Sequence, residues 1–282
     1  MRFFLSTSIL WILTPLAAFA AEEGGHHALP LHAEKIFGDL PITNSMIMTW
    51  VAALIVIVFA KAATRQMNAI PSGLQNLAEG LVESLYDFLE GILGAHLVKR
   101  TFWFFGGVFI IILFTNWIGL LPGVGTVKYL EAPILRGGNA DLNMTVALSL
   151  IFTALWFYWA LTENGVVGFL KHIFAPKGEF KGFMKVAMIV IFAAVGMIEV
   201  VSILLRPVAL SFRLFGNIYA GENMLETMMS LVPKWMAFAP ALPFYFLELL
   251  VGLIQALVFM LLTAVFLKLI CDHGDDHEEA HH

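Results

Sequence analysis

Charged and amide side chains interrupt a long apolar stretch that runs from about Phe183 to Val232. An arginine placed near the centre of a lipid bilayer costs roughly 2.5–3.5 kcal/mol on insertion scales. Such residues therefore face a partner or a water-filled path more often than lipid. The alternative is that a long side chain reaches the headgroup surface. That alternative suits Arg206, which precedes Pro207 near an expected surface, better than Arg213, which has apolar residues on both sides. The polar residues of this stretch are Arg206, Arg213, Asn217 and Glu222.

A second apolar stretch, Ala241 to Leu269, contains Glu248 and Gln255. If the two stretches form antiparallel helices, two residues at the same depth lie equally far in sequence from the turn between them. The pairs Glu222–Glu248 and Arg213–Gln255 both place that turn near residues 234–235. We therefore expect each pair to lie at one depth, with Arg213 and Gln255 approaching each other. Two ionised carboxylates at one depth would repel, so we expect the pair to share protons. For the amides, the alternative is a purely structural hydrogen bond between helices.

The elements that position these residues are membrane helices. The 282-residue chain is 60% hydrophobic and only 13% charged, whereas soluble domains carry about 25% charged residues. Repeated apolar runs of about 20 residues indicate spanning helices and not a barrel. One cysteine, Cys271, excludes an intrachain disulfide, and no basic patch suggests nucleic acid.

We predict an all-α polytopic protein with five spans in the mature chain, the last two forming a long tilted hairpin. A further amphipathic helix, Pro71 to Gly94, is expected on the cytoplasmic surface because apolar and acidic residues alternate at helical spacing. Fifty residues of helix exceed the bilayer thickness, so the fourth span must tilt, kink at Pro207 or extend beyond the membrane. The expected spans are 44–60, 101–121, 142–161, 183–232 and 241–269.

The ends of the chain differ in character from the membrane domain, which we place at residues 43–271. Residues 1–20 read as a signal peptide or an uncleaved anchor, and 21–42 as an external polar arm. Residues 272–282 read as a disordered tail whose histidines, like those of the arm, bind metal or are simply solvated. Lysines and arginines gather in the expected inner loops, which predicts an outside N-terminus and a cytoplasmic C-terminus.

Four motifs resemble subunit a of the membrane sector of F-type ATP synthases, over about residues 44–268. The most specific is the block from Phe212 to Glu222, FRLFGNIYAGE. The others are Asp141 to Thr145, Gln255 to Thr263 and, more weakly, Asn116 to Pro122. Some members of the family carry histidine at the position of Glu222 or Glu248, and some carry a carboxylate at the position of Gly119. The outer path of this chain would therefore use different groups.

The resemblance implies a proton-channel stator subunit in a bacterial inner membrane, with no cofactor, no metal and no catalysis of its own. Its implied partners are a rotating ring of small carboxylate-bearing hairpins, peripheral-stalk subunits, membrane lipid and, indirectly, the catalytic sector. Arg213 would separate two aqueous half-channels, and Glu222, Glu248, Asn217 and Gln255 would line the outer one. Further implied positions are Glu199, Arg206, Asp141, Asn143 and Asn116, although a structural Glu199–Arg206 contact or helix capping by Asp141 would also account for these residues.

Two other classes remain open from the sequence alone. One is a proton- or sodium-coupled secondary transporter, which the missing internal repeat disfavours. The other is a membrane scaffold, which the embedded Arg213 disfavours.

Overall fold

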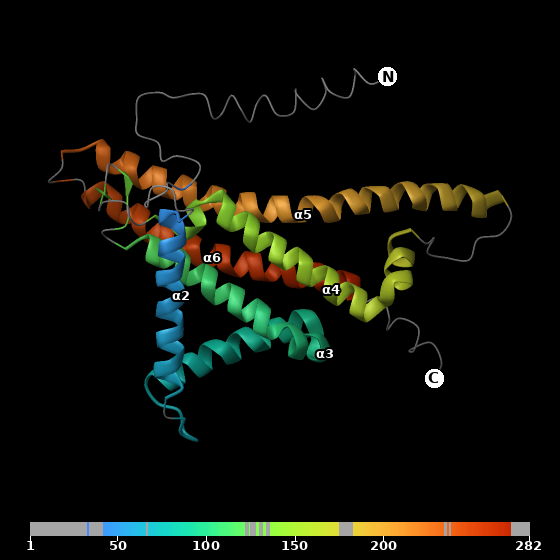
Figure 1. Ribbon diagram of the computed structural model, residues 1–282, viewed down its shortest axis with the longest axis horizontal. Helices are drawn as coiled ribbons and strands as arrows, with labels where there is room; N and C mark the ends of the chain where they lie inside the picture. Colours follow the sequence, from blue (N-terminus) through green and yellow to red (C-terminus); the bar gives the residue numbers. More distant parts are fainter. Residues whose placement is uncertain are drawn as a thin grey trace, which may run out of the picture.

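A computed structural model gives the arrangement of the chain (Figure 1). The predicted signal peptide, nearly all of the polar arm and the tail lie outside the residues that it describes. Side chains are not described at positions 128–129, 132–133, 172, 183–187 and 189–190. The described residues are 33, 42–65, 67–121, 124, 128–129, 132–133, 136–174, 183–233, 236 and 238–271.

The described residues form five helices long and apolar enough to cross a membrane, which confirms the predicted polytopic all-α fold. The fourth is a single helix of 48 residues, about 72 Å long. It runs through Pro207 without interruption and is far longer than a hydrocarbon core of about 30 Å. The five helices are α2 (Asn44–Ala63), α3 (Leu74–Gly119), α4 (Leu142–Phe174), α5 (Phe183–Ser230) and α6 (Phe238–Cys271).

Two helices bend sharply at glycines with positive φ, a conformation that glycine adopts without steric cost. The α3 bend is at Gly94 (φ 80°), where the predicted amphipathic segment ends, and α3 continues directly into the second span. The α4 bend is at Gly165 (φ 66°), so this helix extends past the expected end at residue 161. Each bend redirects a helix without an intervening loop, which the sequence pattern alone did not indicate. The membrane-surface position of residues 74–93 stays a prediction.

Helix α6 lies at the centre of the packing and contacts α3, α4 and α5. Phe105 of α3 and Phe259 of α6 are fully buried in a common hydrophobic cluster. Polar side chains of the neighbouring helices also donate hydrogen bonds to α6 backbone carbonyls. The four donor–acceptor pairs are Trp117 Nε1 to Leu249 O (3.0 Å), Asn116 Nδ2 to Gly252 O (3.1 Å), Trp156 Nε1 to Phe266 O (3.0 Å) and Asn164 Nδ2 to Ile270 O (2.7 Å).

The connection between α3 and α4 is not a plain loop. Strands β2 (Lys128–Tyr129) and β3 (Ala132–Pro133) pair antiparallel, and the 3₁₀ helix η1 (Gly138–Ala140) follows. Helix η1 is buried and contacts α2, α3, α4 and α5. The segment therefore fills one end of the bundle and fixes the spacing of the surrounding helices.

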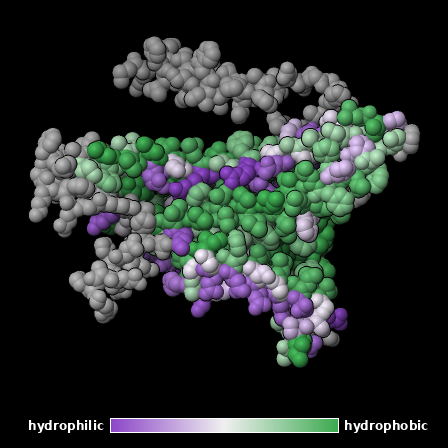
Figure 2. Space-filling view, turned by 180° about the vertical axis from the view of Figure 1, so that it is seen from behind, coloured by the Kyte–Doolittle hydropathy of each residue, from purple (hydrophilic) through white to green (hydrophobic). Residues whose placement is uncertain are grey.

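The outer surface is mostly apolar, as a lipid-facing protein requires. Figure 2 shows one face covered largely by hydrophobic residues and crossed by a narrow hydrophilic band at the height of α5. Helix α5 is the least covered of the five: only 11% of its most hydrophobic window is buried. One long side of α5 is thus available to something outside this chain.

Candidate functional site

Two hollows lie along the α5–α6 pair, one on each side of the turn between Arg213 and Asn217. The first, of about 410 Å³, is lined by α5 residues 217–225 and α6 residues 244–255, and includes Glu248 and Gln255. The second, of about 420 Å³, is lined by α5 residues 198–213 and by Leu262 and Phe266 of α6. Both are open grooves in an otherwise apolar pair of helices. Polar side chains are therefore reachable from two separate places on the surface.

Arg213 lies on the exposed side of α5 and lines the second groove. Within the part of the chain that the structure describes, no hydrogen bond or ion pair reaches its guanidinium. A cation in a membrane-spanning helix without a countercharge is costly. Its position is compatible with an anionic partner supplied by another molecule.

The amides of Asn217 and Gln255 join α5 to α6: Nδ2 of Asn217 donates to Oε1 of Gln255 over 2.7 Å. The amide oxygen of Gln255 thus accepts from Asn217, one turn along α5 from Arg213, and the expected approach of Gln255 to Arg213 stays a prediction. A Cβ added at Gly216 would have no neighbour within 4 Å among the described residues, so α5 has no close contact at that glycine. The Asn217–Gln255 hydrogen bond and the contact of Glu248 with Gly221 place α5 and α6 in nearly the same register.

The two carboxylates lie at one depth, as the register argument expects. The Glu248 carboxylate packs directly over Gly221, the residue next to Glu222, and Glu248 is only 5% exposed. Gly221 is the point of closest approach because any side chain there would occupy the space of that carboxylate. Glu222 points toward the segment before η1, where a Cβ added at Gly137 would lie 2.5 Å from its Oε1. The carboxylates interact electrostatically, with Glu226 also close enough to contribute.

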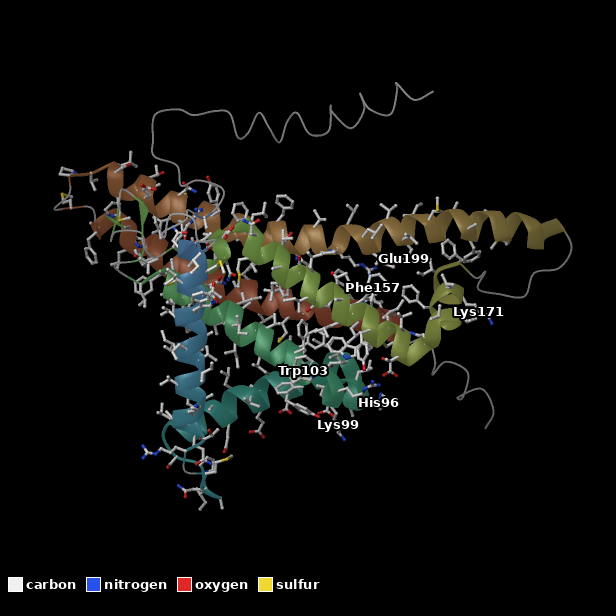
Figure 3. The ribbon with its side chains drawn as sticks, in the orientation of Figure 1. His96, Lys99, Trp103, Phe157, Lys171 and Glu199 are labelled. Atoms are coloured by element: carbon white, nitrogen blue, oxygen red, sulfur yellow. The ribbon has the colours of Figure 1, made fainter. Side chains whose placement is uncertain are left out.

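Glu199 and Arg206 form an ion pair of 2.8 Å along α5. The guanidinium of Arg206 also stacks over Phe266, 4.6 Å from the ring centroid, and lies 5.7 Å from that of Trp156. Figure 3 shows Glu199 on the side of α5 that faces Phe157 of α4. The structural alternative for this pair is therefore present, and Arg206 has countercharge and aromatic partners that Arg213 lacks.

Asp141 and Asn116 are buried on the side of the bundle that holds η1. Asp141 caps α4 by accepting a hydrogen bond from the backbone N–H of Asn143 (3.0 Å), and it accepts a second from the Ser45 hydroxyl of α2 (2.7 Å). Oδ1 of Asn116 accepts from Asn139 over 2.6 Å. These residues tie the η1 segment to three helices, so their visible role is structural.

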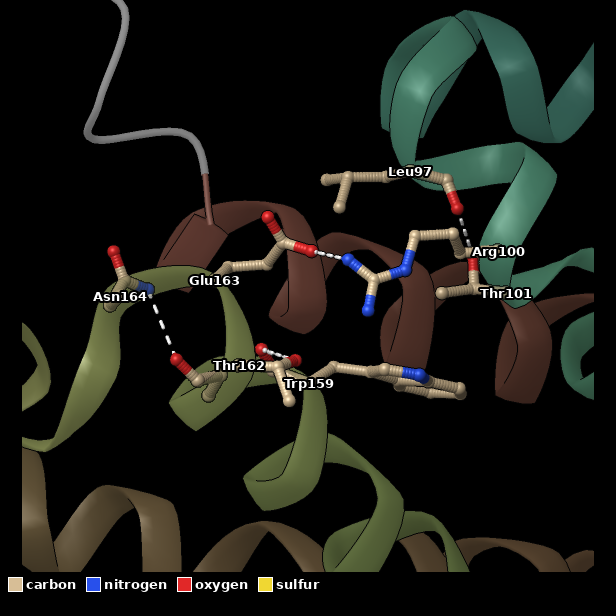
Figure 4. Close-up of polar contacts among 8 residues, drawn as sticks. Leu97, Arg100, Thr101, Trp159, Thr162, Glu163 and Asn164 are labelled. Carbon is tan, nitrogen blue, oxygen red and sulfur yellow. Dashed lines mark hydrogen bonds and ion pairs between the residues drawn. The ribbon is translucent and has the colours of Figure 1, made fainter.

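The opposite end of the bundle carries basic residues. Figure 3 shows His96 and Lys99 near the bend of α3, and Lys171 on the part of α4 beyond its bend. Arg100 of α3 forms an ion pair with Glu163 of α4, which holds the two bent helices together (Figure 4). Arg100 is partly exposed, and we assign the pair no larger role than this clamp.

Sequence reasoning missed Arg136, which lies between the expected spans 101–121 and 142–161. The residue is only 3% exposed, and its guanidinium interacts electrostatically with Glu222. The available signal was Gly137-Gly138 directly after it, since two small residues allow the loop backbone to enter the bundle.

Proton binding and transfer are reactions that the side-chain types of this site can perform. Two carboxylates, two amides and Arg213 lie along one pair of helices, and one groove is lined by Asn217, Glu248 and Gln255. Carboxylates can exchange protons with water or with each other, and amides can orient the water between them.

Comparisons with known proteins agree on one family. Residues 46–268 match the family model described as ATP synthase A chain. A protein of Gloeobacter violaceus named ATP synthase subunit a is 35% identical over 266 residues, which is 93% of this chain and 96% of that protein. Proteins of the same name from Desulforamulus reducens (31%) and Campylobacter curvus (33%) align with 93% and 82% of this chain and 98% and 94% of their own lengths.

Proposed function

We propose a proton-conducting role for this chain, which belongs to the ATP synthase A chain family and is a multi-pass membrane subunit of that complex. In this role it is the stationary partner of a rotating ring of small hairpin subunits. It loads protons onto the ring carboxylates from one side of the membrane and unloads them to the other. ATP chemistry belongs to other subunits, and this chain is not an enzyme by itself.

One observation carries the proposal most directly. Arg213 is exposed on an apolar helix, and no described residue supplies it with a hydrogen bond or a countercharge. We assign the countercharge to a partner outside the chain, because a carboxylate on a lipid-facing ring helix has the right sign and location. The guanidinium stays protonated at any physiological pH, so it attracts an ionised ring carboxylate and blocks a direct proton leak.

The two grooves support an offset path. The groove with Asn217, Glu248 and Gln255 would serve as the outer half-channel, and the groove between Ile198 and Arg213 as the inner one. A ring carboxylate would collect a proton from one groove and release it into the other after almost a full rotation. A proton that crosses 100 mV releases about 2.3 kcal/mol, which this detour converts to rotation.

The orientation of the chain in the membrane follows from the distribution of its basic residues. The end with Lys99, Arg100 and Lys171 would face the bacterial cytoplasm, together with the C-terminus, and the η1 end would face outward. The apolar surface of α2, of which only 17% is buried in its spanning window, leaves room for lipid and for peripheral-stalk helices.

The decisive experiment removes the charge of Arg213. We expect Arg213→Ala to abolish ATP-driven proton pumping in inverted vesicles, while the complex still assembles, because no other unpaired cation in the described residues lies at that depth. Arg213→Lys should also fail largely, since lysine lacks the planar fork and can lose its proton when desolvated. Arg65→Ala, at an exposed arginine just after α2, is the matched control and should pump normally. Pumping by Arg213→Ala at the control rate would exclude the proposed role.

A further inference from the structure

Helix α5 carries two arginines that line the same groove, Arg206 and Arg213. They are seven residues apart, so they lie on nearly the same side of the helix and about 10 Å apart along it. Under the proposed function this groove is the inner half-channel, where a ring carboxylate gives up its proton. The ionised carboxylate would therefore meet two cations, of which only Arg213 separates the half-channels.

The two guanidinium groups have different surroundings. Within the described residues, Arg213 is exposed and has no hydrogen bond or ion pair. The Arg206 side chain is only 16% exposed, and its Nη2 donates to Oε1 of Glu199 over 2.8 Å. Glu199 lies two turns along α5 on the side away from Arg213, so both side chains must extend along the helix to meet. The Arg206 charge is thus drawn away from Arg213.

Two aromatic side chains also hold the guanidinium of Arg206. Its central carbon lies 4.6 Å from the ring centroid of Phe266 of α6 and 5.7 Å from that of Trp156 of α4. A guanidinium within about 6 Å of an aromatic face is attracted to it. The indole is itself fixed, because its Nε1 donates to the Phe266 carbonyl over 3.0 Å. Side chains from three helices therefore keep Arg206 in place.

The Glu199–Arg206 pair carries no net charge, because one carboxylate offsets one guanidinium. Among the described residues that line this groove, Arg213 is then the one uncompensated cation. We propose that Glu199 and the two aromatic side chains mask Arg206, so that the ionised ring carboxylate is attracted to Arg213 alone. The proposal rests on the proposed function. It makes Glu199 a positioning residue that acts through Arg206 and not a carrier of protons.

An unmasked Arg206 would compete with Arg213 for the ring carboxylate. The attraction of two unit charges about 10 Å apart, at an effective dielectric constant of about 20, changes a dissociation constant by about tenfold. The carboxylate would then leave the groove more slowly, and each step of the ring would take longer. We expect a loss of pumping rate of the same order.

The test is ATP-driven proton pumping by the intact complex in inverted vesicles. Glu199→Gln keeps the size of the side chain but removes its charge, and it should slow pumping about tenfold. Adding Arg206→Gln should restore the rate to within about twofold of the unmodified complex, because the second cation is then gone. Glu163→Gln is the matched control. It also deprives an arginine, Arg100, of its carboxylate, but neither residue lines a groove, and pumping should stay normal.

Restoration by the second substitution separates masking from other roles of Glu199. If Glu199 carried protons, or if the ion pair were purely structural, removal of Arg206 as well would not restore pumping. A double variant as slow as Glu199→Gln would therefore overturn the inference, and so would normal pumping by Glu199→Gln alone.

A second variant keeps the test informative if the Glu199→Gln complex does not assemble. Phe266→Leu keeps an apolar side chain but removes the aromatic face under the guanidinium, so it should also slow pumping and be relieved by Arg206→Gln. Pumping by Phe266→Leu that is normal, or slow but not relieved, would count against masking. Failure of the proposed function would look different, because Arg213→Ala would then pump at the rate of its own control.

Discussion

The contact between Gly221 and the Glu248 carboxylate makes the substitution Gly221→Ala a direct test of the site. A methyl group at position 221 would occupy the space that the Glu248 carboxylate now fills. The backbone there is ordinary α-helix, and alanine favours a helix interior over glycine by about 0.5–1 kcal/mol. The substitution therefore acts on the carboxylate and not on the helix.

The size of the effect follows from the contact distance. Carbon atoms pack at about 3.5–4.0 Å, so the carboxylate must retreat by on the order of 1 Å or more. It is the end of a flexible side chain and can move into the adjoining groove of about 410 Å³. The structural cost should thus stay below the roughly 1–3 kcal/mol of a rigid core clash. A displacement of about 1 Å at a reacting group can cost up to 100-fold in rate.

We therefore expect Gly221→Ala to assemble normally and to pump protons at least tenfold more slowly. The measurements are complex yield with thermal unfolding, and fluorescence quenching of a pH-sensitive dye in inverted vesicles. Gly107→Ala is the matched control, because a Cβ at this α3 glycine has no neighbour within 4 Å. If Gly221→Ala pumps as fast as Gly107→Ala, the exact position of Glu248 does not matter for transport and the reasoning fails.

Two further predictions concern the hydrogen bonds that hold the site. Asn217→Ala and Gln255→Ala should each slow pumping several-fold, and the double variant should be no worse than the more severe single one, because both remove one 2.7 Å bond; additive losses would argue against a joint role. Asp141→Asn should lower the free energy of unfolding by about 1–3 kcal/mol, since it weakens charge-assisted bonds from Ser45 and the α4 N-terminus. An unchanged midpoint in thermal unfolding of the purified complex would contradict the second.

Much of the helix arrangement was predictable because lipid imposes strict rules on a chain. Apolar length located all five spans, and the long element expected at 183–232 is α5, Phe183–Ser230. The turn near residues 234–235 follows from antiparallel depth alone. The ends of α3 and α4 were less accurate, because helices that bend at Gly94 and Gly165 continue where a pattern of separate spans would place loops.

The site residues also differ in how well the sequence predicts their positions. Carboxylates and arginines are easily recognised in a sequence when apolar residues surround them. The shared depth of Glu222 and Glu248 could therefore be predicted. Arg136 could not, because a loop arginine is unremarkable until η1 is seen to enter the bundle. The hydrogen-bond partner of Gln255 is Asn217, one turn along α5 from Arg213, and a register argument that assumes equal helix tilts does not distinguish two neighbouring turns.

The hydrogen bonds that α6 accepts have a consequence for how this chain can diverge in sequence. Each acceptor is a backbone carbonyl, which every amino acid supplies, whereas each donor is a specific indole or amide. Homologues should therefore substitute freely among apolar residues at Leu249 and Ile270 without losing a bond, while keeping Trp117, Trp156 and Asn164. Gly252 is the exception, since an added Cβ would lie only 3.1 Å from Cβ of Asn116. A substitution of Gly252 would therefore require a compensating change on α3.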